Sequence, residues 1–432
     1  MRAEDHDLVR REPDLPGLAL LLDGPRFAER LRRDLPELEP VGGPTYLRHK
    51  PGTSCIAAYA AADDGGPTTL YAKAFRSADR AKRLKAIGRA SAAGYRLLVW
   101  EDAEIVVCPF PIDLELTALA DLHAAPARAA LLRKVLGPAA VGIGGRLRPL
   151  HHRPERRFVA RFEGAAGEVA VKLHAGAGFA AAKPAAKAFA PRDSLLVPRM
   201  LGRSHRHGIV VTTWVDGLPL DTAWTATGAA IDAWRAVGAA LAALHAQAPA
   251  MLRRRERDEV PRRILAVSGY LGMLLPARAA RVDALANRLA AALGDAPRPS
   301  TGIHGDFHPG QVLLRGDGVV ILDLDEAVRG DPVDDIGTFV AHLERAALRP
   351  SASAPLPDPR SARAALLAGY GADDIAPRVD RATAAALFLL APHPFRAREP
   401  DWPRRIDGLL ARVEGLLVGA AQPHRVAAGA TR

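Results

Sequence analysis

Cysteine is nearly absent from this sequence, which contains only Cys55 and Cys108 among its 432 residues. Two cysteines cannot form a disulfide framework, and their spacing is not that of zinc ligands. We therefore expect both to be buried as small apolar side chains. Apolar runs long enough to span a bilayer are also absent, and the N-terminal residues mix acids and bases ahead of a short apolar segment. These absences predict a soluble, cytoplasmic protein with no membrane partner.

Signatures of nucleic-acid binding are missing as well. The formal net charge is +11, and it comes mostly from arginines scattered among abundant Ala, Gly and Pro. No ribonucleoprotein, zinc or helix-turn-helix pattern accompanies these arginines. The charge therefore indicates solubility and attraction of anions, and we expect no nucleic-acid partner.

The stretch from His304 to Pro332 carries the clearest chemical pattern and reads HGDFHPGQVLLRGDGVVILDLDEAVRGDP. Asp306 is followed after four residues by the amide of Gln311, and an apolar, strand-like run then leads to Asp323. A phosphoryl transfer needs a carboxylate near the acceptor hydroxyl, together with an amide oxygen and a second carboxylate on Mg²⁺. The order and spacing match a kinase catalytic loop followed by its metal-binding Asp. The alternative is a set of turn carboxylates, since Asp and Gly are common in turns.

On these residues the sequence resembles the aminoglycoside phosphotransferase-like kinases, whose catalytic stretch reads HGDxxxxN before a metal-binding Asp and a later DP. The matching positions are His304, Gly305, Asp306, Gln311, Asp323, Asp331 and Pro332. Gln311 replaces the usual Asn with the same amide on one more methylene, and the maltokinases look similar in having HGDxHxGQ. The resemblance implies that Asp306 orients or deprotonates the acceptor and that His304 braces the loop. It also implies that Gln311 and Asp323 hold Mg²⁺, while Asp325, two residues further on the same predicted strand, is either another metal ligand or a solvated charge.

Other polar residues near this stretch are expected to be structural. We expect Asp331 to cap the helix that follows it, and Asp334 and Asp335 to be surface or capping residues. His245 ends an apolar helical pattern where the family often has LxxLH, and we expect it to be structural rather than catalytic.

Two β-rich segments about a hundred residues apart share one pattern. From residue 45 onward the sequence predicts a strand, a turn, a second strand, a hairpin and a third strand that carries Lys73. The later segment places Arg153–Pro154 where the first has Lys50–Pro51, and Lys172 where the first has Lys73. We interpret this as an internal duplication of a small lobe, with chance similarity of two basic-Pro hairpins as the alternative.

The second copy is the better match to a kinase nucleotide lobe. Its VAVKLH has the form of a kinase third strand, and it lies nearer to His304 in the chain. The resemblance implies that Lys172 pairs with the nucleotide phosphates and that the first copy is an N-terminal cap like that of the maltokinases. Lys73 is then expected to be a solvent-facing strand residue.

Further nucleotide contacts are expected on either side of Lys172. No glycine-rich loop joins the strands of the second copy, but Arg153 offers a donor in that loop. An apolar strand from Ile209 leads into an expected interlobe hinge, where the family binds adenine. The hinge residues that we expect to contact the nucleotide are Thr213, Trp214 and Val215.

These patterns predict an α+β, bilobal, protein-kinase-like fold with a β-rich N-lobe and a mainly helical C-lobe, preceded by a β-containing cap that resembles a duplicated N-lobe. The predicted domains are 1–140 for the cap, 141–216 for the nucleotide-binding N-lobe and 217–432 for the C-lobe with the catalytic and metal site. Residues 1–40 are expected to form a helical lead-in, and 422–432 a frayed tail.

The predicted activity is transfer of the γ-phosphoryl group of ATP or GTP, with Mg²⁺, to a small-molecule hydroxyl. Sugars, aminoglycosides and other natural products remain open as acceptors, and both a monomer and a homodimer remain open. No Glu lies between Lys172 and Glu256, and the acid closest after the lysine is Asp193, so the usual Lys–Glu ion pair has no clear partner. A catalytically silent kinase-like protein that binds a nucleotide or a partner is therefore the alternative.

Overall fold

The computed structural model describes residues 1–63, 65–92, 94–95, 97–137, 145–164, 167–185, 187–223, 229–294, 299–316, 318–349, 358–371 and 375–421. These residues form two compact units. We call the first the β-rich unit; it comprises Met1–Lys187, Pro198–Trp214 and His393–Pro403. The second, the helical unit, comprises Ala188–Val197, Val215–Pro392 and Arg404–Arg432. The predicted tail at 422–432 and the predicted boundary at residue 140 lie outside the described residues, and the three-domain division stays a prediction.

The β-rich unit begins with helices, as the apolar spacing of the first residues predicts. These are α1 (Ala3–Arg11), α2 (Leu18–Leu22) and α3 (Gly24–Asp34). Asp23 caps α3, because its side chain accepts a hydrogen bond from the backbone N–H of Arg26. Phe27 on α3 stacks on Tyr59 of the adjoining sheet at 4.1 Å between ring centroids, which fixes the helix against that sheet.

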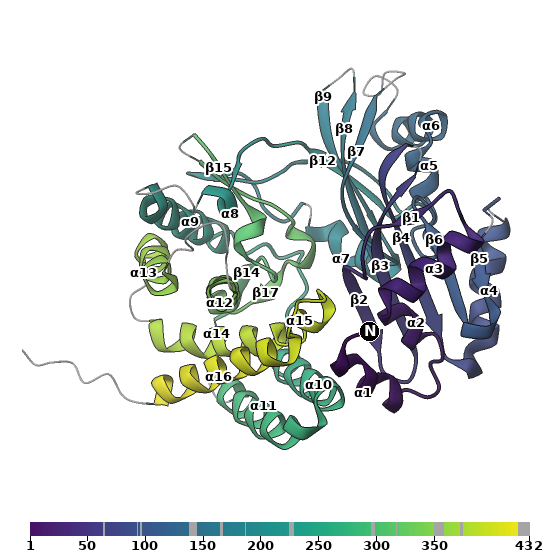
Figure 1. The fold of residues 1–432 in the computed structure, drawn as a ribbon. Coiled ribbons are helices and arrows are strands. Elements are labelled where there is room, and N and C mark those ends of the chain that lie inside the picture. Colours follow the sequence, from purple (N-terminus) through teal and green to yellow (C-terminus); the bar gives the residue numbers. More distant parts are fainter. Residues whose placement is uncertain are drawn as a thin grey trace, which may run out of the picture. The chain divides into compact units, whose positions relative to one another are not determined.

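The first sheet is antiparallel and has the order β1-β3-β4-β6-β5, with β2 also paired to β3 (Figure 1). Its strands are β1 (Glu39–Pro40), β2 (Tyr46–Lys50), β3 (Ser54–Asp63), β4 (Gly66–Phe75), β5 (Leu98–Trp100) and β6 (Ile105–Pro109). Helix α4 (Arg80–Ala92) follows β4, and its Ala86 belongs to a buried cluster with Ile56, Tyr71 and Val106 of the sheet. Cys55 and Cys108 are buried, as predicted, and neither forms a disulfide.

The second sheet has the order β11-β12-β9-β8-β7 and is also antiparallel. Its strands are β7 (Arg146–Arg153), β8 (Arg157–Gly164), β9 (Gly167–His174), β11 (Met200–Ser204) and β12 (Ile209–Thr213). Along β8, Phe158, Ala160 and Phe162 are buried and alternate with more exposed residues, as a sheet with one covered face requires. These three residues belong to a buried cluster to which helices α5 (Leu119–His123) and α6 (Ala125–Leu136) also contribute. Helix α7 (Gly176–Ala185) follows β9.

Apart from β1, the two sheets have the same strand order, and their connections differ in β10, which lies between α7 and β11 and belongs to a sheet of the helical unit. In each sheet three consecutive strands form a meander, a helix follows the third strand, and the fifth strand then pairs with the third while the fourth lies at the edge. Lys73 on β4 is paired with Val106 of β6, and Lys172 on β9 is paired with Val210 of β12. The two lysines therefore occupy equivalent places, which is the arrangement that a duplicated lobe produces.

A late segment of the chain also belongs to the β-rich unit. This segment, His393–Pro403, contains the short helix α15 (His393–Arg396). Arg398 forms an ion pair with Asp5 of α1, with Nη1 3.0 Å from Oδ1, and both side chains are almost completely buried. Arg2 donates hydrogen bonds to the backbone oxygens of Arg398 and Glu399, each at 2.8 Å. The first and last parts of this unit are therefore joined by buried polar contacts.

The helical unit contains two small sheets among its helices (Figure 1). One has the order β10-β16-β15-β13 and the other pairs β14 with β17; their bounds are β10 (Leu195–Leu196), β13 (Leu218–Pro219), β14 (Thr301–Ile303), β15 (Val312–Arg315), β16 (Gly318–Ile321) and β17 (Val328–Gly330). The helices are α8 (Leu220–Ala223), α9 (Ala229–His245), α10 (Glu259–Leu274), α11 (Ala279–Gly294), α12 (Pro332–Ala347), α13 (Pro359–Tyr370), α14 (Ala376–Leu390) and α16 (Trp402–Ala421). No helix among the described residues is long and apolar enough to cross a membrane.

Candidate active site

The predicted catalytic loop leaves β14 at Ile303 and continues through a short 3₁₀ turn, Pro309–Gln311, into β15. Gly305 has φ +86°, and a Cβ on it would lie 2.3 Å from the backbone oxygen of Glu326. Only glycine fits there, because both the conformation and the close approach exclude a side chain. This bend leaves the side chain of Asp306 on the exposed side of the loop.

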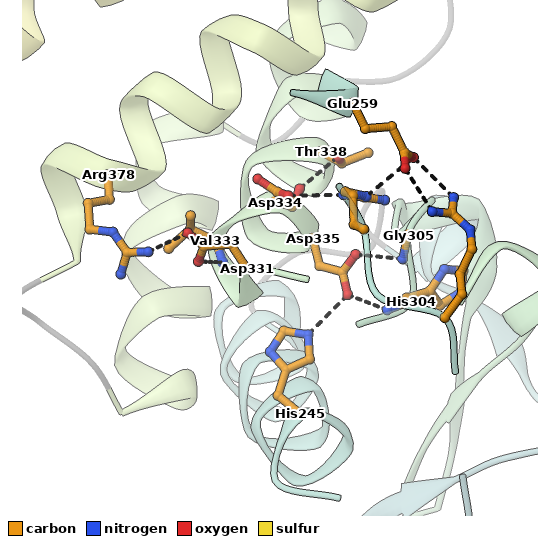
Figure 2. Close-up of polar contacts among 12 residues, drawn as sticks. His245, Glu259, His304, Gly305, Asp331, Val333, Asp334, Asp335, Thr338 and Arg378 are labelled. Atoms are coloured by element: carbon orange, nitrogen blue, oxygen red, sulfur yellow. Dashed lines mark hydrogen bonds and ion pairs between the residues drawn. The ribbon is translucent and has the colours of Figure 1, made fainter. Parts of the chain in front are cut away.

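A buried carboxylate on α12 binds the backbone of the loop (Figure 2). The Oδ2 atom of Asp335 accepts a hydrogen bond from the backbone N–H of His304 at 2.6 Å, and its Oδ1 accepts one from Gly305 N–H at 2.9 Å. The ring of His245 contacts the same Oδ2 at 3.0 Å through Nε2, and contacts the Tyr370 hydroxyl at 2.9 Å through Nδ1. Burial acts to raise the pKa of Asp335, but His245, His304 and the Gly305 N–H together hold this pKa below its ordinary value.

The prediction that Asp335 is a surface or capping residue is therefore wrong, since it is 1% exposed and binds the loop. The sequence did contain a signal for this position. Asp335 stands four residues before Phe339 and one before Ile336, inside the apolar stripe of α12, and a carboxylate in such a stripe is buried with partners. The structural role expected of His245 agrees with its two contacts.

The ring of His304 joins the catalytic loop to the end of β16. Its Nδ1 accepts a hydrogen bond from the backbone N–H of Asp306 at 3.3 Å, so Nε2 carries the proton and donates to the backbone oxygen of Leu322 at 2.7 Å. His304 is completely buried. A ring held at both nitrogens gives the loop a rigid support.

The side chains of Gln311 and Asp323 converge after the loop. Nε2 of Gln311 lies 3.2 Å from Oδ2 of Asp323 and 3.2 Å from Nε2 of His308. Asp323 follows the end of β16 with φ +59°, a left-handed conformation that Asp tolerates better than most residues. In the structure it is thus the amide nitrogen of Gln311 that faces Asp323. The amide oxygen would have to turn toward Asp323 for this amide and carboxylate to offer Mg²⁺ the hard oxygen atoms that it prefers. Within the described ranges, no group of three or more His, Cys, Asp or Glu side chains is arranged to hold a metal ion.

The sequence pattern predicted that the strand continues through Asp325, and this prediction is wrong. β16 ends at Ile321, the left-handed conformation of Asp323 turns the chain, and Asp325 falls in the 3₁₀ turn Leu324–Glu326. Its side chain is buried, so it is not a solvated charge. The physical reason is the positive φ at Asp323, which ends the alternation of faces on which the prediction rested.

Two acids at the start of α12 have their own partners (Figure 2). Asp331 caps the helix by accepting a hydrogen bond from Val333 N–H at 3.2 Å, which confirms the predicted cap. Its other oxygen lies 2.5 Å from Nη2 of Arg378. Asp334 is half-buried and forms an ion pair with Arg255 at 2.9 Å.

The residues predicted to bind a nucleotide lie on the β-rich unit or at its end. Lys172 is half-buried on β9. Arg153 is exposed at the end of β7, and its Nε donates to Nε2 of His151 at 3.1 Å. None of the residues of α7, the helix after Lys172, is acidic. Asp193 is exposed in the helical unit and lies 3.6 Å from Nε of Arg192.

The predicted hinge residues follow β12. Thr213 donates its backbone N–H to the Arg199 oxygen at 2.9 Å, and its hydroxyl accepts from Arg199 N–H at 3.0 Å. Trp214 lies under the guanidinium of Arg161, 4.7 Å from the ring centroid. Val215 is the first residue that belongs to the helical unit in this part of the chain.

Lys73 is not a solvent-facing residue, contrary to the sequence-based expectation. Its side chain is 17% exposed, and Nζ lies 2.9 and 3.0 Å from the two carboxylate oxygens of Glu155. Arg48 approaches the same carboxylate at 2.6 Å and also donates to the backbone oxygen of Pro154. Glu155 has φ +56° in the turn between β7 and β8. The sequence offered no signal for this contact, because the partners lie far apart in the chain.

Comparison with known proteins identifies related sequences and folds. A family model described as the phosphotransferase enzyme family matches residues 147–387, which is more than half of the chain. The chain is similar to a thermostable mutant of aminoglycoside phosphotransferase APH(4)-Ia solved with ADP and hygromycin B, at 14% identity and a TM-score of 0.50, over 68% of this chain and 99% of that chain. It is also similar to a choline/ethanolamine kinase family protein from Mesorhizobium loti, at 21% identity and a TM-score of 0.48, over 68% and 94% of the two chains. No curated protein matches the sequence. The predicted α+β, kinase-like fold is thus confirmed.

Proposed function

This chain belongs to the phosphotransferase enzyme family, and from that premise we propose that it transfers the γ-phosphoryl group of ATP or GTP to a hydroxyl of a small molecule. The observation that carries the proposal is the support of the catalytic loop. Asp335 binds two consecutive backbone N–H groups, of His304 and Gly305, immediately before Asp306. Such a fixed loop suits a reaction in which catalysis comes from positioning and from neutralising charge.

Each residue of the loop has a proposed role. Asp306 orients the acceptor hydroxyl and accepts its proton, and His304 holds the backbone of Asp306 in place. Gln311 and Asp323 hold Mg²⁺ through their side-chain oxygens, and Asp325 stays a proposed further ligand. The bound metal ion supplies positive charge to the transferring phosphoryl group.

Residues of the β-rich unit are proposed to bind the nucleotide. Lys172 pairs with the α- and β-phosphates, and Arg153 adds a second positive charge. Thr213, Trp214 and Val215 form the adenine-binding segment at the end of β12. The support for these roles is the position of Lys172 on the third strand of its sheet, equivalent to that of a kinase third-strand lysine.

Replacement of Asp306 tests the proposal. Asp306→Asn is expected to lower turnover of ATP with any accepted hydroxyl compound by about 10²-fold or more, because the proton acceptor is lost, while nucleotide affinity is retained. Turnover and nucleotide binding are measured by coupled assay and by calorimetry, with neutral sugars, nucleosides and aminoglycosides as acceptors. A variant that keeps more than about a tenth of the wild-type turnover contradicts the role of Asp306.

The metal site has its own test. Gln311→Asn keeps the amide but moves its oxygen by about one bond length, so the Mg²⁺ concentration that gives half-maximal activity is expected to rise while nucleotide binding persists. Unchanged Mg²⁺ dependence contradicts ligation by Gln311.

A silent, nucleotide-binding protein is the second candidate function. It is favoured by one observation, that α7, the helix that follows β9, contains no acidic residue. Nucleotide binding without turnover of any acceptor, in the wild-type protein, is the result that this second function predicts.

A further inference from the structure

A cavity of about 640 Å³ lies in the helical unit next to the candidate active site. A smaller cavity of about 140 Å³ is lined by Gly305 and Asp306. The two cavities share Arg255 and Asp334, so they meet at the ion pair between these residues. A molecule with its hydroxyl at Asp306 would have to pass this ion pair to extend into the larger cavity.

Arginine dominates the lining of the larger cavity. Its basic residues are Arg254, Arg255, Arg257 and Arg329. The acids that line it have partners of their own: Asp331 is bound by Arg378, Asp334 by Arg255 and Glu256 by Arg262. Neither Arg254 nor Arg329 forms an ion pair within the described part of the chain. The cavity thus offers positive charge that its own carboxylates do not neutralise.

Three buried polar atoms in this lining have no hydrogen-bond partner among the described residues: Nε of Arg255, Nε of Arg329 and Oγ of Ser300. Arg255 is already engaged in ion pairs with Asp334 and Glu259, which leaves Arg329 and Ser300. Buried polar atoms in native proteins are almost always hydrogen-bonded, so these two in one cavity indicate a site for an external acceptor. Both atoms can donate, and an anionic oxygen is the best acceptor for them.

The backbone fixes the two arginines beside each other. Arg254 and Arg329 are partners in a parallel β-bridge, and the amide of Arg329 donates to Arg253 O while the amide of Arg255 donates to Arg329 O, each at 2.8 Å. Side chains of paired residues project to the same face, and both of these line the cavity. Two guanidinium groups on a fixed backbone suit a carboxylate or phosphate, since less freedom is lost on binding.

We propose that the phosphate acceptor carries an anionic group, a carboxylate or a phosphate, which binds to Arg254, Arg329 and Ser300 while its hydroxyl lies at Asp306. This inference rests on the proposed function and narrows the acceptor class. Compounds rich in ammonium groups, such as aminoglycosides, are poor ligands of this cavity, because its unneutralised charges are positive.

A matched set of sugars tests the charge of the acceptor. Glucose, glucosamine, glucuronate and glucose 6-phosphate share one ring and differ in charge, and their binding is measured by calorimetry with excess ADP and Mg²⁺ present to occupy the nucleotide site. The anionic sugars are expected to bind about tenfold or more tightly than glucose, and glucosamine more weakly than glucose. Whether glucuronate or glucose 6-phosphate binds more tightly decides whether the anionic group is a carboxylate or a phosphate. Equal binding of all four sugars, or no binding of either anionic sugar, overturns the proposal.

Variants locate the anion site. The preference is the affinity for the anionic sugar divided by the affinity for glucose. Arg254→Ala and Arg329→Gln are each expected to lower this ratio about tenfold, while Arg329→Lys retains part of it. Arg235, on α9, is also exposed and is paired with Asp232, so Arg235→Ala is the matched control and leaves the preference unchanged. Full preference in both Arg254→Ala and Arg329→Gln overturns the site.

Failure of the proposed function and failure of this inference give different experimental results. Sugar binding is measured without turnover, whereas phosphoryl transfer from ATP is measured in the Asp306→Asn comparison. Anion preference with no transfer to any acceptor contradicts the proposed function alone, and transfer with no anion preference contradicts this inference alone.

Discussion

The turn between β2 and β3 in the first sheet and the turn between β7 and β8 in the second follow one pattern: His, a basic residue, Pro, and then a residue with positive φ. In the first turn that last residue is Gly52, at φ +60°. The carboxylate of Glu12 accepts a hydrogen bond from Gly52 N–H at 2.8 Å, and its other oxygen lies 3.4 Å from the ring of His49. A buried acid from outside the strands thus closes this turn.

The second turn has the same kind of closure with a different acid. Asp113 accepts from the backbone N–H of Glu155 at 2.8 Å and contacts the ring of His152 at 3.0 Å. Because the two acids come from different parts of the chain, the similarity lies in the turn itself. The shared closure of the turns is evidence of a different kind from the shared strand order, and it strengthens the interpretation of the two sheets as a duplication.

The difference between the turns is the residue at positive φ. Glycine adopts this conformation freely, whereas a glutamate there costs of order 1 kcal/mol. The carboxylate of Glu155 is 5% exposed and is bound by Lys73 and Arg48 of the first sheet. Lys73, which occupies the position equivalent to Lys172, therefore fastens the second turn. The comparison teaches that one position of a repeated sheet can serve stability in one copy, while the equivalent residue of the other copy, Lys172, is the one that we propose to bind the nucleotide.

The largest expected effect separates the two lysines. Lys172→Met is expected to lower phosphoryl transfer by about 10²-fold, because a charge on the nucleotide phosphates is lost. Lys73→Met is expected to change transfer only a few-fold and to lower the unfolding free energy instead. Steady-state kinetics and urea unfolding of both variants are the measurements. Equal kinetic losses, or a larger loss at Lys73, mean that the first sheet is the nucleotide lobe.

The next effect concerns the contact between the sheets. Glu155→Gln is expected to lower the unfolding free energy by about 1–3 kcal/mol, because two partly buried cations lose their acid. The double variant with Lys73→Met is expected to be more stable than the sum of the single losses predicts, since both remove the same ion pair. Additive losses in urea unfolding contradict the coupling.

A smaller effect is expected at the acids that close the turns. Asp113→Asn and Glu12→Gln are each expected to cost about 1–2 kcal/mol of unfolding free energy. Burial acts to raise the pKa of Glu12, but His49 and the Gly52 N–H outweigh it and leave that pKa lowered. The stability that Glu12 contributes is therefore complete above its ordinary pKa and is lost as the pH falls through the lowered value. The ordinary pKa of Glu is ~4.3, so the test covers about pH 3 to 6. Over this range the unfolding free energy of Glu12→Gln is expected to depend less on pH than that of the wild type.

The smallest effect tests the backbone of the turns. Glu155→Gly is expected to be more stable than Glu155→Ala by about 1 kcal/mol, because both lose the ion pairs but only glycine relieves the positive φ. Gly52→Ala is expected to cost about the same amount in the first sheet. Thermal unfolding of the three variants checks this, and equal stability of the two Glu155 variants argues against strain at that residue.

Patterns of local origin could be read from the sequence. The strand meanders, the place of each lysine and the helix cap at Asp331 all depend on periodicity or on short-range turn chemistry. The apolar stripe of α12 signalled that Asp335 is buried, but not that its partner is His245, 90 residues away. Glu155 left no signal of this kind, because its partner Lys73 is 82 residues away. The strand predicted through Asp325 failed because one left-handed residue, Asp323, ends it, and a φ value leaves little trace in a pattern of apolar residues.

The buried ion pair between Asp5 and Arg398 has a consequence for how the protein is made. The two residues are separated by 393 positions, so a ribosome adding about 5–20 residues per second makes the arginine roughly 20–80 s after the aspartate. During that interval the nascent chain holds an acid whose buried partner does not yet exist. Docking of α1 onto the rest of the β-rich unit is therefore expected to be a late event in synthesis, after both sheets have been translated.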